Sequence, residues 1–288
     1  MHGKVVNRNR VVGSLAACGL ILSTGVALAQ EEARAPVSFP THGADEGSSK
    51  HAPPAERPRD TRQDVPIVAY AYSAQGAAPK SVGAYGYGLA LAAAGQDAVL
   101  GGGATVWGSP IDRLTLIGDA SRDVSGRFTP SVAAMGRLYG SRGEAFTLGV
   151  LGKWKAEGFG VGPHGDEIES ELEGGVLATL LAGRFHLDSN VLAGGALGGS
   201  GEADVEARIR PGFDLGRLVR LGLDSQFRVR VAGPKYLPNG RIWDFAAGAQ
   251  TVVGNQSFFG AFTFGPSTTG VLTNDIGVTG MLALGGTT

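Results

Sequence analysis

Two adjacent segments, Ala203–Leu215 and Val219–Val231, alternate apolar residues with polar or charged ones along their whole length. Successive side chains of a β-strand point to opposite faces, so each segment is predicted to be a strand with one apolar face. A tilted strand crosses a membrane in roughly 9–11 residues, and strands of this greater length are uncommon in a soluble sheet. The alternation therefore predicts a membrane-spanning hairpin with one face toward lipid.

The two faces of this hairpin are predicted to meet different surroundings. The face expected to contact lipid carries Val205, Ile209, Phe213, Leu221, Leu223, Phe227 and Val229. The face expected to line the lumen of a barrel carries Asp204, Glu206, Arg208, Arg210, Asp214, Arg220, Asp224, Arg228 and Arg230.

Charge fixes the expected register of the hairpin. An antiparallel pairing across the turn Gly216–Leu218 sets Asp214 opposite Arg220, Arg210 opposite Asp224, Glu206 opposite Arg228 and Asp204 opposite Arg230. Every directly opposed pair of charges then has unlike signs, and such cross-strand pairs support a register.

The segments 144–157 and 167–181 repeat the pattern, with lysines on one strand and glutamates on the other. One register pairs Lys153 with Glu173 and Lys155 with Glu171, and these four side chains are also predicted to line the lumen. The same register sets Glu157 against Glu169, two like charges, so the pairing next to their loop stays open.

Alternation elsewhere predicts about twelve strands, an even number as in single-chain bacterial barrels. The expected ranges are 82–95, 97–108, 111–120, 129–140, 144–157, 167–181, 184–197, 203–215, 219–232, 241–254, 256–265 and 272–284. Short turns and longer connections alternate between them. Because membrane barrels have short periplasmic turns and longer outer loops, both termini are expected in the periplasm. The short apolar piece Ile67–Tyr72 is expected to add a strand or to plug the lumen.

From Val82 to Gly286 the chain resembles the outer-membrane β-barrel proteins of Gram-negative bacteria. The resemblance implies outer-membrane lipid and the barrel-insertion machinery as partners. Two features depart from it: the chain ends at Thr288 rather than at an aromatic residue, and only 7% of its residues are aromatic. The expected aromatic girdles comprise Trp107, Trp154, Trp243, Tyr139 and Phe258. Pro211 lacks an N–H donor and is expected to weaken or bend its strand.

The N-terminal part of the sequence predicts export. Residues 1–29 read as a signal peptide, with Lys4, Arg8 and Arg10 before an apolar run and a cleavage site between Ala29 and Gln30. Two alternatives are a transmembrane anchor and lipidation of Cys18, the only cysteine. Residues 30–66 are rich in polar residues and proline, which predicts a disordered periplasmic tether, and residues 67–288 are predicted to form the barrel domain.

Few residues suggest chemistry. The GxSxG, HExxH, P-loop and CxxC motifs are absent from the sequence. His186, Asp188 and Asn190 share one strand face and are interpreted as polar lumen lining rather than as a general base or a metal site. With a net charge of −1, no nucleic-acid partner is indicated. We expect no cofactor, no metal and no catalytic residue.

The sequence therefore favours a non-enzymatic outer-membrane barrel. It would serve as a narrow channel for small solutes or as a structural membrane protein with a charge-paired lumen. The alternatives are a soluble secreted or periplasmic β-sandwich that binds a ligand, and a barrel enzyme that modifies lipid. Neither a solute nor a periplasmic partner for the tether is specified by the residues.

Overall fold

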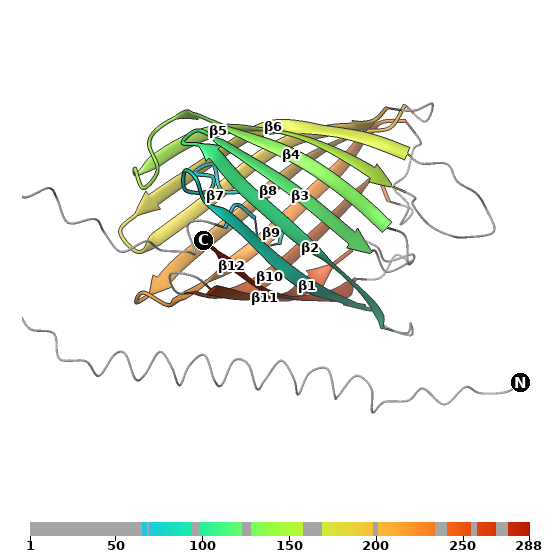
Figure 1. The fold of residues 1–288 in the computed structure, drawn as a ribbon. Coiled ribbons are helices and arrows are strands. Elements are labelled where there is room, and N and C mark those ends of the chain that lie inside the picture. The colour runs from blue at the N-terminus through green and yellow to red at the C-terminus, as the bar shows by residue number, and fades with distance from the viewer. Residues whose placement is uncertain are drawn as a thin grey trace, which may run out of the picture. The chain divides into compact units, whose positions relative to one another are not determined.

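The computed structural model describes residues 65–67, 69–93, 98–122, 128–157, 169–197, 201–233, 241–254, 258–268 and 276–288. Within these residues twelve antiparallel strands form one closed barrel, in which each strand pairs with its neighbours in sequence and the first pairs with the last (Figure 1). The strands are β1 (Val82–Ala92), β2 (Val99–Ile111), β3 (Leu114–Arg122), β4 (Phe128–Tyr139), β5 (Phe146–Glu157), β6 (Glu169–Ala182), β7 (Phe185–Ala196), β8 (Ala203–Leu215), β9 (Val219–Ala232), β10 (Trp243–Gly254), β11 (Phe258–Ser267) and β12 (Gly277–Thr287).

This topology confirms the predicted twelve-stranded up-and-down barrel. A soluble two-sheet sandwich is wrong as a fold for this chain, because the sheet closes on itself through β1 and β12. Tight connections such as 112–113, 183–184 and 216–218 lie at the barrel end where β1 begins and β12 ends. The largest difference from expectation is β12, which was expected at 272–284.

The register predicted from charge is observed in both hairpins. Asp204 pairs with Arg230 and Asp214 with Arg220 across β8 and β9. Lys153 pairs with Glu173 across β5 and β6, and the ladder continues to Glu157 and Glu169. The like-charged pair near the loop therefore does not shift the register, which the remaining pairs of the hairpin determine.

Pro211 interrupts the ladder on one side only. The pairing of β8 with β9 passes from Ile209–Ser225 directly to Gly212–Gly222. On the other side Pro211 still lies opposite Leu187 of β7. This is the local weakening expected from a residue without an N–H donor.

The inner and outer faces of the barrel differ as the alternation requires. Each of the twelve strands exposes at least one large apolar side chain on the outer face, such as Leu100, Leu223 and Phe258. The inner face carries buried polar and charged side chains, including Asp188 and Asp224, which are 0% exposed. The outer face is therefore apolar, as in no soluble protein, while the interior combines buried polar and charged groups with an apolar cluster around Trp107.

Aromatic side chains fill part of the interior and correct one prediction. Trp107, expected in an interfacial girdle, is only 2% exposed and lies inside the barrel. Its ring centroid is 5.8 Å from that of Tyr85 and 6.1 Å from that of Phe259. The indole lies directly over Gly83, where a Cβ would be 2.2 Å from the ring. The sequence around β2 misled because glycine and alanine occupy both faces there.

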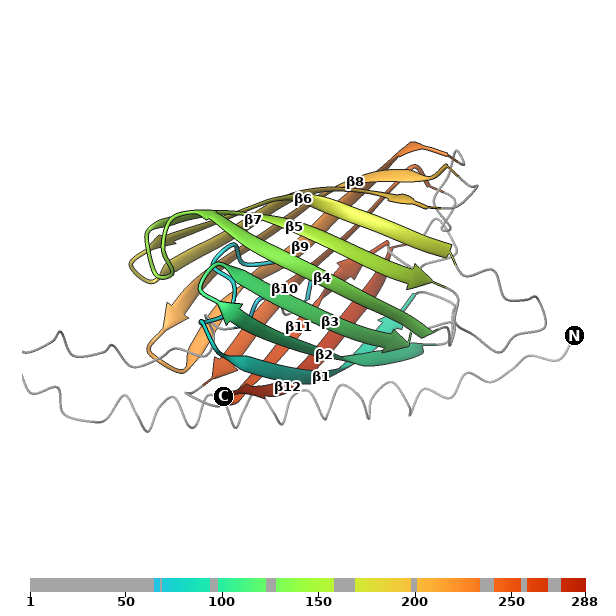
Figure 2. The ribbon, with the colours of Figure 1, turned by 45° about the horizontal axis from the view of Figure 1, so that its top comes forward.

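Residues 65–67 and 69–81, which precede β1, run inside the ring of strands (Figures 1 and 2). We call the stretch 65–81 the plug segment. Its residues from Val65 to Ala78 are mostly buried, and Ile67 forms an isolated bridge with Tyr72 rather than joining the sheet. Of the two roles expected for Ile67–Tyr72, the structure shows the lumen-filling one. The predicted signal peptide, and residues 30–64 of the predicted tether, lie outside the described residues.

Candidate functional site

The candidate site is the filled interior of the barrel, formed by β3 to β10 and the plug segment. The ladder residues of β8 predicted to face the lumen point inward, with Arg208 and Arg210 each only 6% exposed. Those of β9 also point inward, and Arg220 and Asp224 are buried. Seven residues predicted to contact lipid lie on the opposite faces of β8 and β9: Val205, Ile209, Phe213, Leu221, Leu223, Phe227 and Val229.

Two of the four charge pairs expected in this hairpin form ion pairs directly. Arg230 Nε donates to Asp204 Oδ1 at 2.6 Å, and Arg220 Nε donates to Asp214 Oδ1 at 2.7 Å. Both pairs lie near the ends of the hairpin. Glu202, just before β8, adds a second carboxylate 3.2 Å from Arg230.

The two other expected pairs take different partners. Arg228 donates to Asp244 of β10 at 2.6 Å, while Glu206 accepts from Arg208 on its own strand. Arg210 donates to Asp188 on β7, and Asp224 accepts hydrogen bonds from the plug segment. Each inward charge in a closed barrel has neighbours on both sides and inside, so the directly opposed residue is only one of several available partners.

Asp188 on β7 is the centre of the most buried cluster. Its Oδ2 accepts hydrogen bonds from Arg210 Nε and Nη2 at 2.9 and 2.6 Å. His186 Nε2 lies 2.7 Å from the same oxygen, and Thr179 donates to Oδ1 at 2.6 Å. A buried carboxylate with this many donors is fully satisfied.

This cluster has the residue types of a nucleophile and a base but not their accessibility. Thr179, His186 and Asp188 are 1%, 4% and 0% exposed, and the Thr179 hydroxyl is also bonded to the plug segment. Its arrangement holds the wall and the plug segment together. Among the described residues no group of His, Cys, Asp or Glu side chains is arranged to hold a metal ion.

Asp224 and Asn190 bind the main chain at the tip of the plug segment. The backbone N–H groups of Tyr70 and Ala71 each donate to one oxygen of Asp224, both at 3.1 Å. Asn190 accepts from the N–H of Tyr72 at 2.8 Å and donates to its carbonyl at 2.9 Å. The two wall residues therefore satisfy buried main-chain groups that the segment cannot satisfy itself.

Two arginines clamp the same segment from either side. Arg208 donates to the carbonyl of Tyr70 at 3.2 Å, and its guanidinium carbon lies 5.6 Å from the centre of the Tyr72 ring. Arg137 on β4 donates to the carbonyl of Gln75 at 3.2 Å. Arg137 also donates to the main-chain carbonyl of Asp112, in the β2–β3 turn, at 2.7 Å. A second contact, between Arg137 and the side-chain carboxylate of Asp112, lowers the pKa of that carboxyl group.

The hairpin of β5 and β6 contributes the remaining predicted ladder residues. Lys155 lies 2.7 Å from Glu171. Glu173 accepts from Arg208 at 3.0 Å and so connects this hairpin to β8, while Lys153 lies across from it in the ladder. Sequence reasoning missed Asp244 and Arg137 as members of the interior network, although the strand parity around them carried the signal.

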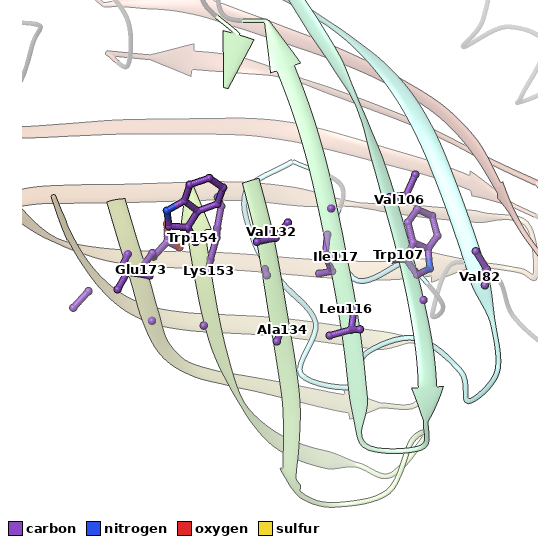
Figure 3. A pocket seen from close by; sticks show the side chains of 17 residues that line it. Val82, Val106, Trp107, Leu116, Ile117, Val132, Ala134, Lys153, Trp154 and Glu173 are labelled. Atoms are coloured by element: carbon purple, nitrogen blue, oxygen red, sulfur yellow. The ribbon is translucent and has the colours of Figure 1, made fainter. Parts of the chain in front are cut away.

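A second hollow, of about 1050 Å³, lies against the wall formed by β1 to β7 (Figure 3). Val106, Leu116 and Val132 line it and are 54%, 48% and 57% exposed, so it opens to the outside of the barrel. Its lining includes a row of small residues, Gly118, Ala134, Gly152, Gly174 and Ala193. It is a concave part of the apolar outer surface, and its lining also includes the inward-facing Trp107, Lys153 and Glu173, so it reaches through the wall between the strands.

Known structures share this barrel fold at low sequence identity. No protein-family model and no curated protein sequence match the chain. The NanC porin aligns with a TM-score of 0.54 and 6% identity over 70% of this chain and 98% of NanC. The NalP autotransporter translocator domain of Neisseria meningitidis gives a TM-score of 0.41 and 13% identity over 72% and 87%. CdiB of Acinetobacter baumannii gives 0.38 and 10% over 71% and 60%. The alignment with NanC confirms the resemblance to outer-membrane β-barrels for the fold.

Proposed function

We propose that this chain is a non-enzymatic outer-membrane barrel that serves as a narrow small-solute channel, held closed by the plug segment. The observation that carries the membrane location is the apolar outer surface. Large apolar side chains are exposed on all twelve strands, among them Ile209, Leu221 and Phe227 at 47%, 42% and 45%. A soluble monomer rarely exposes an apolar patch of more than a few hundred Å².

Closure of the sheet supports the same conclusion. A membrane interior offers no water to free N–H and C=O groups, so a spanning sheet must pair every strand edge. Here the pairing of β1 with β12 removes the edges that an open sheet would leave. The tight turns at the barrel end that holds both barrel termini are proposed to face the periplasm, with the longer loops outside.

The interior supports a channel that is closed at rest. The plug segment and the ion pairs of β6 to β10 occupy the lumen, and main-chain contacts hold the segment at Asp224 and Asn190. Hydrogen bonds and the apolar packing of Tyr72, Ala74 and Ala77 hold the segment to the wall. Because Ile67 bridges to Tyr72 of the same segment and not to a barrel strand, residues 65–78 can leave without unpairing the sheet. A passage for small solutes would remain, lined by the charges of β6 to β10 on one side and by apolar side chains such as Trp107 and Phe259 on the other.

Cell fractionation and gel migration test the membrane proposal. The full chain is expected in the outer-membrane fraction, migrating fast without boiling and more slowly after it. A soluble periplasmic product without a heat-dependent shift would contradict the outward-facing apolar residues as a lipid contact. Planar-bilayer recording tests the channel. The purified chain is expected to show a low resting conductance with rare channel openings.

A purely structural role is the second candidate. It is favoured by the Arg210–Asp188 pair, which is buried and bridges two strands across the lumen wall. In that case conductance stays at the level of the bare bilayer even when the plug segment is weakened. Conductance of the weakened variants therefore separates the two roles.

A further inference from the structure

The wall of the barrel recognises the plug segment mainly through its main chain. Besides the contacts of Asp224 and Asn190, the N–H of Ala74 donates to Thr179 Oγ1 at 2.8 Å. The N–H of Ala77 donates to Thr115 Oγ1 at 3.0 Å. Main-chain groups are the same in every polypeptide, so a site built this way can accept another segment that folds back as this one does through the bridge of Ile67 with Tyr72.

Side-chain size provides the selectivity of this site. Ala71, Ala74 and Ala77 are 0%, 2% and 1% exposed, so no larger side chain fits at those places without moving the wall. Gly149 on β5 lies against Ala74, because a Cβ on that glycine would be 3.7 Å from the alanine Cβ. Larger side chains would overpack these positions.

Both ends of the segment lie toward the barrel end with the tight turns. Val65 lines a small void together with Leu181 and His186, which flank the β6–β7 turn. Ser81 leads directly into β1, while the tip near Tyr70 and Ala71 reaches deeper, to Asp224. A polypeptide can therefore reach the site from that end without threading through the barrel.

We propose that the barrel interior is a binding site for a polypeptide segment that folds back on itself and has small side chains at the places of Ala71, Ala74 and Ala77. Residues 65–81 occupy it in cis, and a separate polypeptide of the same chemistry can occupy it in trans. The proposal rests on the proposed function only in requiring that the plug segment can leave the lumen. Neither membrane location nor conduction is needed for binding.

A test must first empty the site, because a tethered segment competes at an effective concentration on the order of millimolar. Ala71→Glu does this without touching the wall, since it places a carboxylate beside Asp224 in a position that is fully buried. Ala74→Leu is a second, uncharged change for the same purpose. Folding of the full-length chain in detergent is checked by heat-dependent gel migration.

Release of the segment is measured separately from binding. A cysteine introduced by Ser73→Cys, in a Cys18→Ser background, is expected to be protected from a maleimide in the otherwise unchanged chain, because Ser73 is 7% exposed. It is expected to react in the Ala71→Glu or Ala74→Leu chain. Protection that persists in both folded variants overturns the proposal, since the segment would then be a fixed part of the barrel.

Binding is measured by fluorescence anisotropy with a labelled peptide of residues 65–81. The Ala71→Glu chain is expected to bind this peptide at least ~10-fold more tightly than the unchanged chain, whose site is occupied in cis. The same peptide carrying Ala71→Glu is expected to bind neither chain. If the released chain does not bind the unchanged peptide, or binds both peptides equally, the proposal is wrong. This test measures peptide binding and not fractionation or conductance. A failure to bind peptide is therefore distinguishable from a failure of the proposed membrane location or channel.

Discussion

Arg210 on β8 donates both its Nε and Nη2 hydrogens to a single oxygen of Asp188 on β7, at 2.9 and 2.6 Å. The two residues lie directly opposite each other in the β7–β8 ladder. Because Asp188 is 0% exposed and Arg210 is 6% exposed, neither charge has water to replace its partner.

Asp188→Asn should therefore destabilise the barrel strongly. It leaves the buried charge of Arg210 without a counter-charge, and breaking a buried pair in this way costs about 3–5 kcal/mol. Urea unfolding in detergent, followed by tryptophan fluorescence, measures the loss. The double variant Asp188→Leu/Arg210→Met removes both charges and should lose less than the single variant. Equal losses would argue against an uncompensated charge as the cause.

Weakening the plug segment should open the channel. Asn190→Ala removes both hydrogen bonds to the main chain of Tyr72. Leaving buried groups unsatisfied costs about 1–3 kcal/mol, a factor of roughly 5 to 150 in the open population. Planar-bilayer recording should show that increase. Ser189→Ala, on the outward face of the same strand, is the matched control and should behave as the unchanged chain. If Asn190→Ala conducts no more than the control Ser189→Ala, the structural role is favoured.

Gly222 should not tolerate a side chain. A Cβ there would lie 2.2 Å from the Pro211 carbonyl oxygen, at the break in the β8–β9 ladder. Backbone must shift to accommodate it, so Gly222→Ala should cost about 1–3 kcal/mol in unfolding free energy. Gly152→Ala is the control, because a Cβ at Gly152 meets no atom within 4 Å. Similar urea midpoints for the two variants would contradict the close approach.

The three tryptophans should respond differently to lipid. Trp154 and Trp243 lie on the outer side, whereas Trp107 lies inside the barrel at 2% exposure. In vesicles of brominated lipid, fluorescence of the Trp154→Phe/Trp243→Phe variant should be quenched little. The Trp107→Phe variant should be quenched as strongly as the unchanged chain. Strong quenching in the Trp154→Phe/Trp243→Phe variant, which retains only Trp107, would place that side chain in lipid and refute its inward position.

The β2–β3 turn should contribute to stability in a pH-dependent way. The pKa of Asp112 is lowered by its hydrogen bond to Arg137, so the folded state favours the carboxylate. That contribution is present above the carboxyl pKa of the unfolded chain and is lost as the pH falls through the lower folded pKa. The carboxylate is 60% exposed, so the effect should be small. Asp112→Asn should lower the urea midpoint at pH 7 and leave it unchanged at acidic pH.

Sequence alone determined the strands, their faces and their register, because these depend on local geometry. Alternation along β8 and β9 assigns each side chain to the inner or outer face through the period of two of a strand. The unlike charges of Asp204 with Arg230, and of Asp214 with Arg220, then select one register. Where glycine and alanine fill both faces, as around Trp107, the alternation carries no contrast and the assignment was wrong.

Only the tertiary structure decided which partner each inward charge takes. Arg210 and Asp224 face each other in the expected register, yet Arg210 bonds Asp188 and Asp224 bonds the plug segment. These choices depend on closing the barrel and on what enters it, and neither is encoded in the alternation of one hairpin. The sequence offered a strand or a plug for Ile67–Tyr72. The segment fills the lumen because wall residues such as Asp224 and Asn190 satisfy its buried main-chain groups.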